Sequence, residues 1–558
     1  MDLNIRIAGE AGQGVQTTGN LLAGSLAALG LHVLASQSYL SRIRGGLNWM
    51  DVRVADTELF GARELADLLV ALTPEAREIL QNEVTASGII LYDGDEADGA
   101  TGIPFTSIAR TVSGSALMAN TVAAGAVYAL LGYPLDALCH YLREEFSFKG
   151  DEIVEANIRA ATAGAERVKT AALQPAAPRP VGAPRAIADG AGAAALGAAT
   201  AGVKLASAYP MSPSTATFAA LAALADDYGI VVEQAEDEIA AVNMICGATY
   251  AGVPALTTTS GGGFALMVEG LSLAGMMELP IVILLAQRPG PATGLPTRTA
   301  QQDLRFALHA GHGEFARAIY APGTLQQCFD ITRQALATAH QYQTPVIILT
   351  DQYLQDLAKN IPPLDARAPA IDRGILHDAP AEYRRYAVTA SGVSPRAIPG
   401  GAARVVVDSD EHDETGHLTE DLTVHLAQQD KRMRKAEGMA ADALPPDYYG
   451  PPGAEQVLIA WGSSYGPCRE AVDLLNAAGG SYALLHFSQV WPINTAATRA
   501  LLANSRKRYS VEGNATGQFA AMLREARALD DCDNILRYDG LAFTAEYIID
   551  RLTGGNHD

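Results

Sequence analysis

The residues best suited to chemistry gather where a predicted strand is followed by acidic side chains and then by an apolar helix. The acidic side chains are those of Glu233, Glu236, Asp237 and Glu238. A carboxylate at the start of a helix accepts hydrogen bonds from free N–H groups and is favoured there by the helix dipole. A buried carboxylate can also act as a general acid or base. The residues alone favour the capping role for any one of the four.

A second candidate is Arg288, which follows the apolar strand predicted at residues 281–285 and precedes a Pro-Gly-Pro turn. The apolar strand before it argues against an ordinary surface arginine. Proteins built from parallel strands and helices bind ligands at the carboxyl ends of the strands. A planar guanidinium there can bind a carboxylate with two hydrogen bonds. The position therefore suggests an anion-binding residue.

Two other patterns are better explained by structure than by chemistry. The Gly-rich residues 9–14 follow a strand, but their spacing differs from the G-x-G-x-x-G of a dinucleotide-binding turn. A tight turn without a ligand is predicted there. Residues 408–421 are acidic and contain His412 and His417, but the spacing fits no helix-borne pair of metal ligands. A solvated loop is predicted, and no metal site is assigned to the chain.

Composition excludes several classes of function. The 558 residues include 40 Lys and Arg against 62 Asp and Glu, a net charge of −22, which disfavours nucleic acid as a partner. The most apolar run, residues 279–286, is too short to cross a bilayer, and no export signal is visible, so we expect a cytoplasmic protein without membrane contact. The five cysteines form no C-x-x-C pair, which disfavours a disulfide framework and a self-contained iron–sulfur site.

Alternating strands and helices predict an α/β fold of three α/β domains in series. The first domain covers residues 1–170 and is predicted to be doubly wound, and the Ala/Pro-rich residues 171–185 form a linker. The second domain covers residues 186–358. Residues 359–453, rich in Pro, Gly and charge, are predicted to be an irregular connection over neighbouring surface. The third domain covers residues 454–558.

Four ordered motifs of the second domain resemble the pyrimidine-binding domain of the 2-oxoacid:ferredoxin oxidoreductases, which use thiamine diphosphate. The motifs are Tyr-Pro-Met-Ser-Pro-Ser-Thr at 209–215, Thr-Thr-Ser-Gly-Gly-Gly-Phe at 258–264, Gln-Arg-Pro-Gly-Pro-Ala-Thr-Gly-Leu-Pro-Thr at 287–297 and Gln-Thr-Pro-Val-Ile-Ile-Leu-Thr-Asp at 343–351. The resemblance covers nearly the whole chain. The first domain resembles the γ domain of these enzymes, and the third is similar to the carboxy-terminal domain of transketolase. A fused γ–α subunit is implied.

The resemblance implies roles for individual residues of the second domain. Glu238 would face the aminopyrimidine ring of thiamine diphosphate and favour the tautomer in which the cofactor removes its own C2 proton. Arg288 would bind the carboxylate of the 2-oxoacid, and the hydroxyl groups of Ser212 and Thr297 would assist it. Ser212 stands where the family usually has threonine and keeps the hydroxyl.

Three further arginines are candidate anion contacts. Arg42 and Arg44 of the γ-like domain are candidate contacts for coenzyme A or the distal end of the substrate. The second cation that a dicarboxylate needs could be Arg298, Arg44 or a lysine of a separate β subunit. The Leu-Pro-Thr-Arg sequence at 295–298 and the γ–α fusion look most like the 2-oxoglutarate branch. Pyruvate or a branched-chain 2-oxoacid would need no second cation, and both stay open as substrates.

This sequence lacks motifs that the reaction needs, and their absence implies a partner subunit. The Asp-Gly at 93–94 lacks the preceding glycine and later asparagine of a magnesium–diphosphate motif and is predicted to be a turn. Mg2+ and a [4Fe–4S] cluster are therefore expected in a separate β subunit. The implied α2β2 enzyme converts 2-oxoglutarate, coenzyme A and oxidised ferredoxin to succinyl-coenzyme A, CO2 and reduced ferredoxin, or runs in the carbon-fixing direction. A non-catalytic scaffold subunit, and a transketolase or decarboxylase without electron transfer, are the alternatives.

Overall fold

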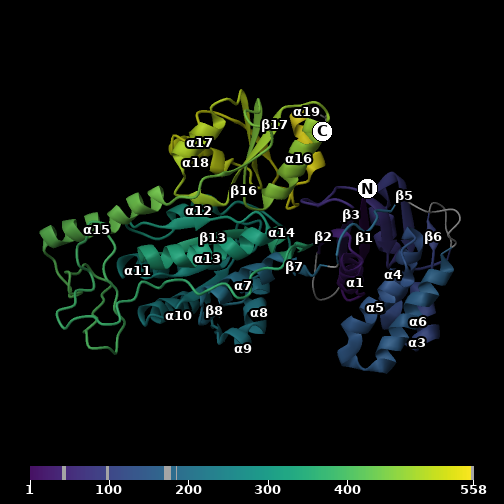
Figure 1. Cartoon of the computed structure of the whole chain (residues 1–558), viewed down its shortest axis with the longest axis horizontal. Coiled ribbons are helices and arrows are strands. Elements are labelled where there is room, and N and C mark those ends of the chain that lie inside the picture. The colour runs from purple at the N-terminus through teal and green to yellow at the C-terminus, as the bar shows by residue number, and fades with distance from the viewer. Residues whose placement is uncertain (40–45, 96–99, 169–176, 184, 555–558) are drawn as a thin grey trace. The chain divides into compact units, whose positions relative to one another are not determined.

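The computed structural model describes residues 1–39, 46–95, 100–168, 177–183 and 185–554, which form three mixed sheets in two compact units (Figure 1). The first unit comprises Met1–Asp189, Asp356–Pro363 and Thr544–Tyr547. The second comprises Gly190–Gln355, Leu364–Phe543 and Ile548–Asp558. Within the described ranges, no helix combines the length and the apolar character needed to cross a bilayer.

An eight-stranded sheet forms the centre of the first unit, in the order β6-β5-β4-β1-β3-β2-β14-β7. Its strands are β1 (Asp2–Glu10), β2 (His32–Ser38), β3 (Leu47–Ala55), β4 (Ala66–Ala71), β5 (Val84–Tyr92), β6 (Thr101–Gly102), β7 (Ile187–Asp189) and β14 (Ala358–Asn360). The helices of this unit include α1 (Val15–Ala28), α2 (Pro74–Leu80), α3 (Phe105–Ser113), α4 (Ala119–Leu131), α5 (Leu135–Phe146) and α6 (Asp151–Arg167). The core side chains of α1 and α4 pack on one face of the sheet, and those of α2 pack on the other.

Half of this sheet differs from the doubly wound arrangement predicted from the sequence, because β1, β3, β2, β14 and β7 pair antiparallel. β2 ends at Ser38 and β3 begins at Leu47, and a crossover helix needs a dozen or more residues, so β3 turns back beside β2. The side chain of Asn360 then fixes β14 to the sheet. It accepts a hydrogen bond from the Val33 N–H at 2.9 Å and donates one to the Leu31 carbonyl at 2.7 Å.

The second unit contains a seven-stranded sheet in the order β18-β12-β13-β11-β10-β8-β9, which is parallel except for β18. Its strands are β8 (Leu205–Ala208), β9 (Val231–Gln234), β10 (Ala255–Thr259), β11 (Val282–Gln287), β12 (Ala318–Tyr320), β13 (Val346–Asp351) and β18 (Gln489–Trp491). Its helices include α7 (Gly190–Ala201), α8 (Thr215–Ala223), α9 (Ala225–Tyr228), α10 (Glu238–Tyr250), α11 (Gly261–Met276), α12 (Leu304–His309), α13 (Leu325–Tyr342) and α14 (Gln352–Asp356). The neighbours α10 and α11 share one apolar core with the sheet.

A five-stranded sheet in the order β15-β17-β16-β19-β20 belongs to the same unit (Figure 1). Its strands are β15 (Asp447–Tyr449), β16 (Gln456–Trp461), β17 (Tyr482–Phe487), β19 (Lys507–Glu512) and β20 (Asp533–Leu536). The helices that follow in the chain are α16 (Tyr465–Ala477), α17 (Thr495–Leu502), α18 (Gln518–Glu525) and α19 (Ala545–Thr553). Its core is continuous with that of the seven-stranded sheet, since one cluster of buried side chains spans both.

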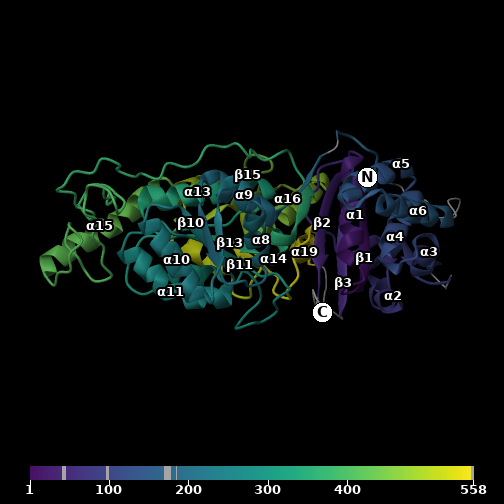
Figure 2. The ribbon, with the colours of Figure 1, turned by 90° about the horizontal axis from the view of Figure 1, so that it is seen from below.

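The connection at residues 359–453, predicted to be irregular, contains the 20-residue helix α15 (Leu422–Ala441), which extends beside the irregular chain (Figure 2). Two lysines of this helix are buried and paired with one carboxylate at the carboxyl end of α11. Lys431 Nζ lies 2.6 Å from Glu278 Oε1, and Lys435 Nζ lies 2.5 Å from Oε2. The helix was missed because its charged residues are typical of a solvated segment, whereas Lys431, Arg432 and Lys435 are buried.

Candidate active site

The predicted site residues of the second unit follow the carboxyl ends of parallel strands of one sheet. Ser212 follows β8, Glu238 follows β9 and Arg288 follows β11. The strands pair in register, and Ala208 at the end of β8 lies opposite Gln234 at the end of β9. Because the carboxyl ends of parallel strands share one edge of a sheet, these residues lie at the edge where ligands bind.

Glu238 is the first residue of α10, and only 3% of its surface is exposed. The helix cap is its neighbour, because the Asp237 side chain accepts a hydrogen bond from the Ala240 N–H at 2.7 Å. Oε1 of Glu238 is buried and has no hydrogen-bond partner among the described residues. A buried polar atom without a partner costs free energy. This oxygen is therefore available to a ligand and does not serve the helix.

The first turn of α11 leaves room for the carboxylate of Glu238. A Cβ atom at Gly263 would lie 2.3 Å from Glu238 Oε1 and equally close to Thr259 Oγ1. The hydroxyl groups of Thr258 and Ser260, in the same segment, are also buried and lack partners within the described chain. The glycine is required by this close approach, and the segment offers several polar atoms to a ligand.

Arg288 and Ser212 are brought together by the structure. Nη1 of Arg288 donates a hydrogen bond to the backbone carbonyl of Ser212 at 2.6 Å. The guanidinium is half-buried, and burial lowers the pKa of Arg288 while the charge of Asp303 opposes that shift. The bond to Ser212 uses one of five N–H donors, and a planar guanidinium can bind a carboxylate with two others.

The chain after Arg288 folds back in a tight turn. The Leu295 N–H donates to the Pro289 carbonyl at 2.9 Å. A Cβ atom at Gly294 would lie 1.7 Å from the same oxygen, so this position requires glycine. Thr297, three residues after Gly294, is half-buried in the same loop as Arg288.

Arg298, the candidate contact for a distal carboxylate, lies against a loop that follows β20. The Thr299 N–H donates to the Gly540 carbonyl at 3.1 Å, and a Cβ atom at Gly540 would lie 3.1 Å from the Arg298 side chain. Burial lowers the pKa of Arg298, and the charge of Asp539 opposes this. The third sheet therefore helps to hold this arginine.

Asp303 was missed by sequence reasoning, although its carboxyl lies at the same edge. Its backbone N–H donates to Gln287 Oε1 at 3.0 Å, directly before Arg288. Burial raises the pKa of Asp303 to about 6, even though the charge of Arg288 lowers it. No motif marks this residue, and the one signal is its place after the predicted carboxylate-binding run and before the short helix α12.

The candidate anion contacts Arg42 and Arg44 lie outside the described residues. The Gly-rich turn at residues 9–14 is described and borders a cavity of about 260 Å³. Gly14 precedes α1 with a φ of 81°, and a Cβ atom there would lie 2.0 Å from the Asn120 side chain. Close packing against Asn120 therefore explains this glycine without a ligand.

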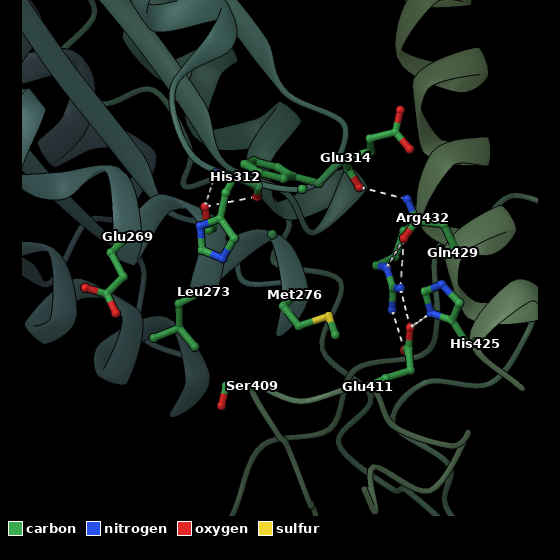
Figure 3. Close-up of a pocket in the computed structure, with 14 residues that line it drawn as sticks. Glu269, Leu273, Met276, His312, Glu314, Ser409, Glu411, His425, Gln429 and Arg432 are labelled. Atoms are coloured by element: carbon green, nitrogen blue, oxygen red, sulfur yellow. Dashed lines mark hydrogen bonds and ion pairs between the residues drawn. The ribbon is translucent and has the colours of Figure 1, made fainter. Parts of the chain in front are cut away.

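Another cavity, of about 420 Å³, lies at the other end of α11 (Figure 3). Its wall includes Met276 of α11, and His425 and Arg432 of α15. Glu411 accepts hydrogen bonds from Arg432 at 2.9 and 2.8 Å and pairs with His425. Burial raises the pKa of Glu411, but Arg432 and His425 lower it to about 2. These ion pairs bind the irregular segment to α15.

The prediction of a solvated loop at residues 408–421 is wrong at His412. Its imidazole is buried, its ring centroid lies 3.8 Å from that of Tyr386, and its Nδ1 lies 2.9 Å from the Asp410 carbonyl. Across the described parts of the chain, no group of three His, Cys, Asp or Glu side chains is placed to hold a metal ion. The sequence did not reveal the stacking of His412 on Tyr386, because the residues around His412 in the chain are polar.

Two family models match the chain. One is described as pyruvate flavodoxin/ferredoxin oxidoreductase, thiamine diphosphate-binding, and matches residues 196–431. The other is described as pyruvate ferredoxin/flavodoxin oxidoreductase and matches residues 4–167.

Curated relatives and a solved structure match over nearly the full length of the chain. The 2-oxoacid:ferredoxin oxidoreductase subunit alpha of a Sulfolobus species is 30% identical over 99% of this chain and 96% of its own. The 2-oxoglutarate oxidoreductase subunit KorA of Mycobacterium tuberculosis is 31% identical over 98% of this chain and 90% of its own. The 2-oxoglutarate:ferredoxin oxidoreductase from Magnetococcus marinus, solved with 2-oxoglutarate, coenzyme A and succinyl-CoA bound, is 31% identical, with a TM-score of 0.91 and 99% of both chains covered.

The resemblance inferred from four motifs is thereby confirmed, as is the α/β fold class. The chain belongs to the 2-oxoacid:ferredoxin oxidoreductases, as an alpha subunit of a thiamine-dependent enzyme that has further subunits.

Proposed function

We propose that this alpha subunit acts on 2-oxoglutarate and, with coenzyme A and oxidised ferredoxin, yields succinyl-coenzyme A, CO2 and reduced ferredoxin, or runs the reverse reaction. The observation that carries the proposal is a buried carboxylate oxygen without a partner in the described chain, on Glu238, at the same sheet edge as the anchored guanidinium of Arg288. Relatives named for 2-oxoglutarate support the choice of substrate.

The residues at the head of α10 fit the pyrimidine end of thiamine diphosphate. The orphaned Oε1 of Glu238, and the space that Gly263 leaves for it, suit a buried hydrogen bond to a ring nitrogen. When bound, the cofactor supplies a nucleophilic carbon for the oxoacid carbonyl and accepts the electrons released by decarboxylation. Glu238 would hold the proton shared with the pyrimidine ring, and its burial would keep water from that proton.

Arg288 holds the carboxylate of the 2-oxoacid in this proposal, and its bond to Ser212 fixes the guanidinium. The hydroxyl groups of Ser212 and Thr297 assist at the same carboxylate. Arg298 takes the distal carboxylate that distinguishes 2-oxoglutarate from pyruvate. The proposed partner is a β subunit that carries Mg2+ and a [4Fe–4S] cluster, reduces ferredoxin and completes an α2β2 assembly, with Arg42 and Arg44 as contacts for coenzyme A.

Replacing Gly263 by alanine is expected to lower kcat by about ten- to hundredfold, because the new Cβ would displace the Glu238 carboxylate. Overpacking of this kind costs about 1–3 kcal/mol. Steady-state turnover of the reconstituted complex measures the effect. Gly262→Ala is the matched control, since the nearest atom to its Cβ would be the Ala292 carbonyl at 3.8 Å, and we expect a much smaller loss. Equal turnover of both variants would contradict the placement of the carboxylate.

Substrate choice tests the proposed function directly. In the complex reconstituted with its β subunit, thiamine diphosphate and Mg2+, kcat/KM is expected to be higher for 2-oxoglutarate than for pyruvate. Arg298→Ala should lower kcat/KM for 2-oxoglutarate about ten- to hundredfold, the effect of a lost charged hydrogen bond of about 1.5–3 kcal/mol. The value for pyruvate should stay within about twofold of the wild type, since pyruvate has no distal carboxylate.

The control for this experiment is Arg499→Ala, which removes an exposed arginine of α17 that pairs with Asp530. It should leave both substrates unchanged, because exposed ion pairs contribute little. A preference of the wild type for pyruvate would overturn the choice of substrate. Decarboxylation without reduction of ferredoxin would instead support an enzyme without electron transfer.

A further inference from the structure

A cavity of about 710 Å³ lies at the edge of the seven-stranded sheet opposite the proposed active site. Arg317, which lines this cavity, directly precedes β12, whereas Glu238 and Arg288 follow the carboxyl ends of β9 and β11. Because β12, β13 and β11 run parallel, their amino ends share the opposite edge of the sheet. All residues that line the cavity belong to the second unit, so it is a separate site within that unit.

The side chain of Arg317 is buried, with 8% of the residue exposed. Its Nη1 donates to the Ala307 carbonyl at 3.1 Å and to the Ala310 carbonyl at 2.6 Å, at the end of α12. The guanidinium carbon lies 4.4 Å from the centre of the Phe315 ring. Within the described chain, Nε and Nη2 make no hydrogen bond and the guanidinium forms no ion pair. Three of its five N–H donors are thus left for a ligand.

No carboxylate of the described chain compensates the charge of Arg317. The two glutamates that line the cavity, Glu314 and Glu525, are both exposed, and Glu525 pairs with Arg305. Burial lowers the pKa of Arg317 to about 10, and no acidic group among the described residues opposes that shift. A buried charge without a counter-ion is costly, so the site is suited to a ligand that brings a negative charge.

The walls of the cavity are mostly apolar. Met439 of α15, Met522 of α18 and Ile493, which follows β18, are buried. Trp491 is half-buried, and Met433 of α15 is exposed. Methionine side chains are flexible and adapt to apolar groups of different shapes. A cavity of this size with apolar walls and few polar groups is typical of a small-molecule site.

We infer that this cavity binds an apolar monocarboxylate, with its carboxylate on Arg317 and its hydrocarbon body against Met439 and Met522. The free atoms Nε and Nη2 lie side by side on one edge of the planar guanidinium, and this fork binds both oxygens of a carboxylate. A ligand with more negative charges is disfavoured, because one cation faces it and Glu314 would repel it. Binding makes and breaks no covalent bond.

Titration calorimetry of the assembled complex with decanoate tests the charge requirement. We expect about one decanoate per alpha chain, the number of such cavities. Decanol has the same chain without the charge and should bind about ten- to hundredfold more weakly, the effect of losing a charged hydrogen bond. Arg317→Met should weaken decanoate binding by the same factor and leave decanol binding within about twofold of the wild type. Equal binding of decanoate and decanol to the wild type would overturn the inference.

A second variant keeps Arg317 and its bonds to α12. Ala436 of α15 lines the cavity and is half-buried, so the ring of Ala436→Phe would occupy the space of the ligand. We expect this variant to bind no decanoate. Ala441→Phe is the matched control, because it adds the same ring at the exposed end of the same helix, outside the residues that line the cavity. Its decanoate binding should equal that of the wild type.

The fluorescence of Trp491 locates the bound ligand. Bromine quenches tryptophan on contact, so 10-bromodecanoate should quench the emission of the wild-type complex, and Trp491→Phe should lose that quenching. Decanoate binding that persists in Ala436→Phe, or a wild-type complex that binds no decanoate because a subunit covers the cavity, overturns the inference. Either result leaves the proposed function intact, because Glu238 and Arg288 lie at the other edge of the sheet.

Discussion

Replacing Glu238 by glutamine in the assembled complex is expected to lower kcat by about two to four orders of magnitude, the usual effect of losing a general acid–base group. Glutamine has nearly the same size and fits the space beside Gly263, so the fold should persist. It cannot share a proton with a ring nitrogen, so activation of the cofactor should fail. Binding of thiamine diphosphate should fall far less than turnover.

Steady-state kinetics and calorimetric binding of the cofactor, measured on the same preparations, separate these two effects. Glu236→Gln is the control, because Glu236 is exposed and lies two residues away. Its kcat should equal that of the wild type. If Glu238→Gln turns over as fast as the wild type, the chain is a scaffold and the catalytic carboxylate lies elsewhere.

Replacing Glu278 by glutamine is expected to destabilise the second unit by about 3–5 kcal/mol, because it leaves buried cations without their carboxylate. Glu278 and Lys431 are 0% exposed, and Lys435 is 2% exposed. Both ammonium groups contact the carboxylate, and Arg385 adds a third positive charge, with a hydrogen bond of 2.9 Å to the Glu278 carbonyl.

The loss of stability in Glu278→Gln should depend on pH, and the pKa of Glu278 sets the direction. Burial raises the pKa of Glu278, but Lys435 and Lys431 lower it more, so it falls well below its usual range. A carboxylate with a lowered pKa stabilises the fold above its ordinary pKa of about 4.5, and this contribution is lost as the pH falls through the lowered value. The variant and the wild type should therefore differ at pH 7 and converge in strong acid.

Urea unfolding at pH 7 and at several acidic pH values measures this difference. Asp530→Asn serves as the control, since it breaks the exposed pair with Arg499 and should change stability by less than about 1 kcal/mol. An unchanged unfolding midpoint for Glu278→Gln would show that the buried cluster contributes nothing to stability.

The elements next to Glu238 were predictable because their signals are local. The strand predicted before the acidic residues is β9 (Val231–Gln234), and the apolar helix predicted after them is α10, which begins at Glu238. The sequence alone could not distinguish the cap from the buried carboxylate among neighbouring acidic residues. The structure separates them, since Asp237 makes the capping bond and Glu238 does not.

The features that were missed depend on partners distant in sequence. The lysines of α15 are indistinguishable from a solvated basic stretch until Glu278 is placed beside them. Asp303 gains its environment from Arg288, fifteen positions earlier, and from the third sheet. Antiparallel pairing of β14 with β2 likewise joins segments that are separated by most of the chain.

A gene divided to encode residues 1–170 and 186–558 as two proteins would not give two self-sufficient folds. The sheet of the first unit continues beyond β2 into β14 and β7, and both strands would come from the second product. Without them, β2 would expose a row of unpaired N–H and C=O groups, an edge that favours aggregation. The two products would have to meet for this sheet to reach its full eight strands.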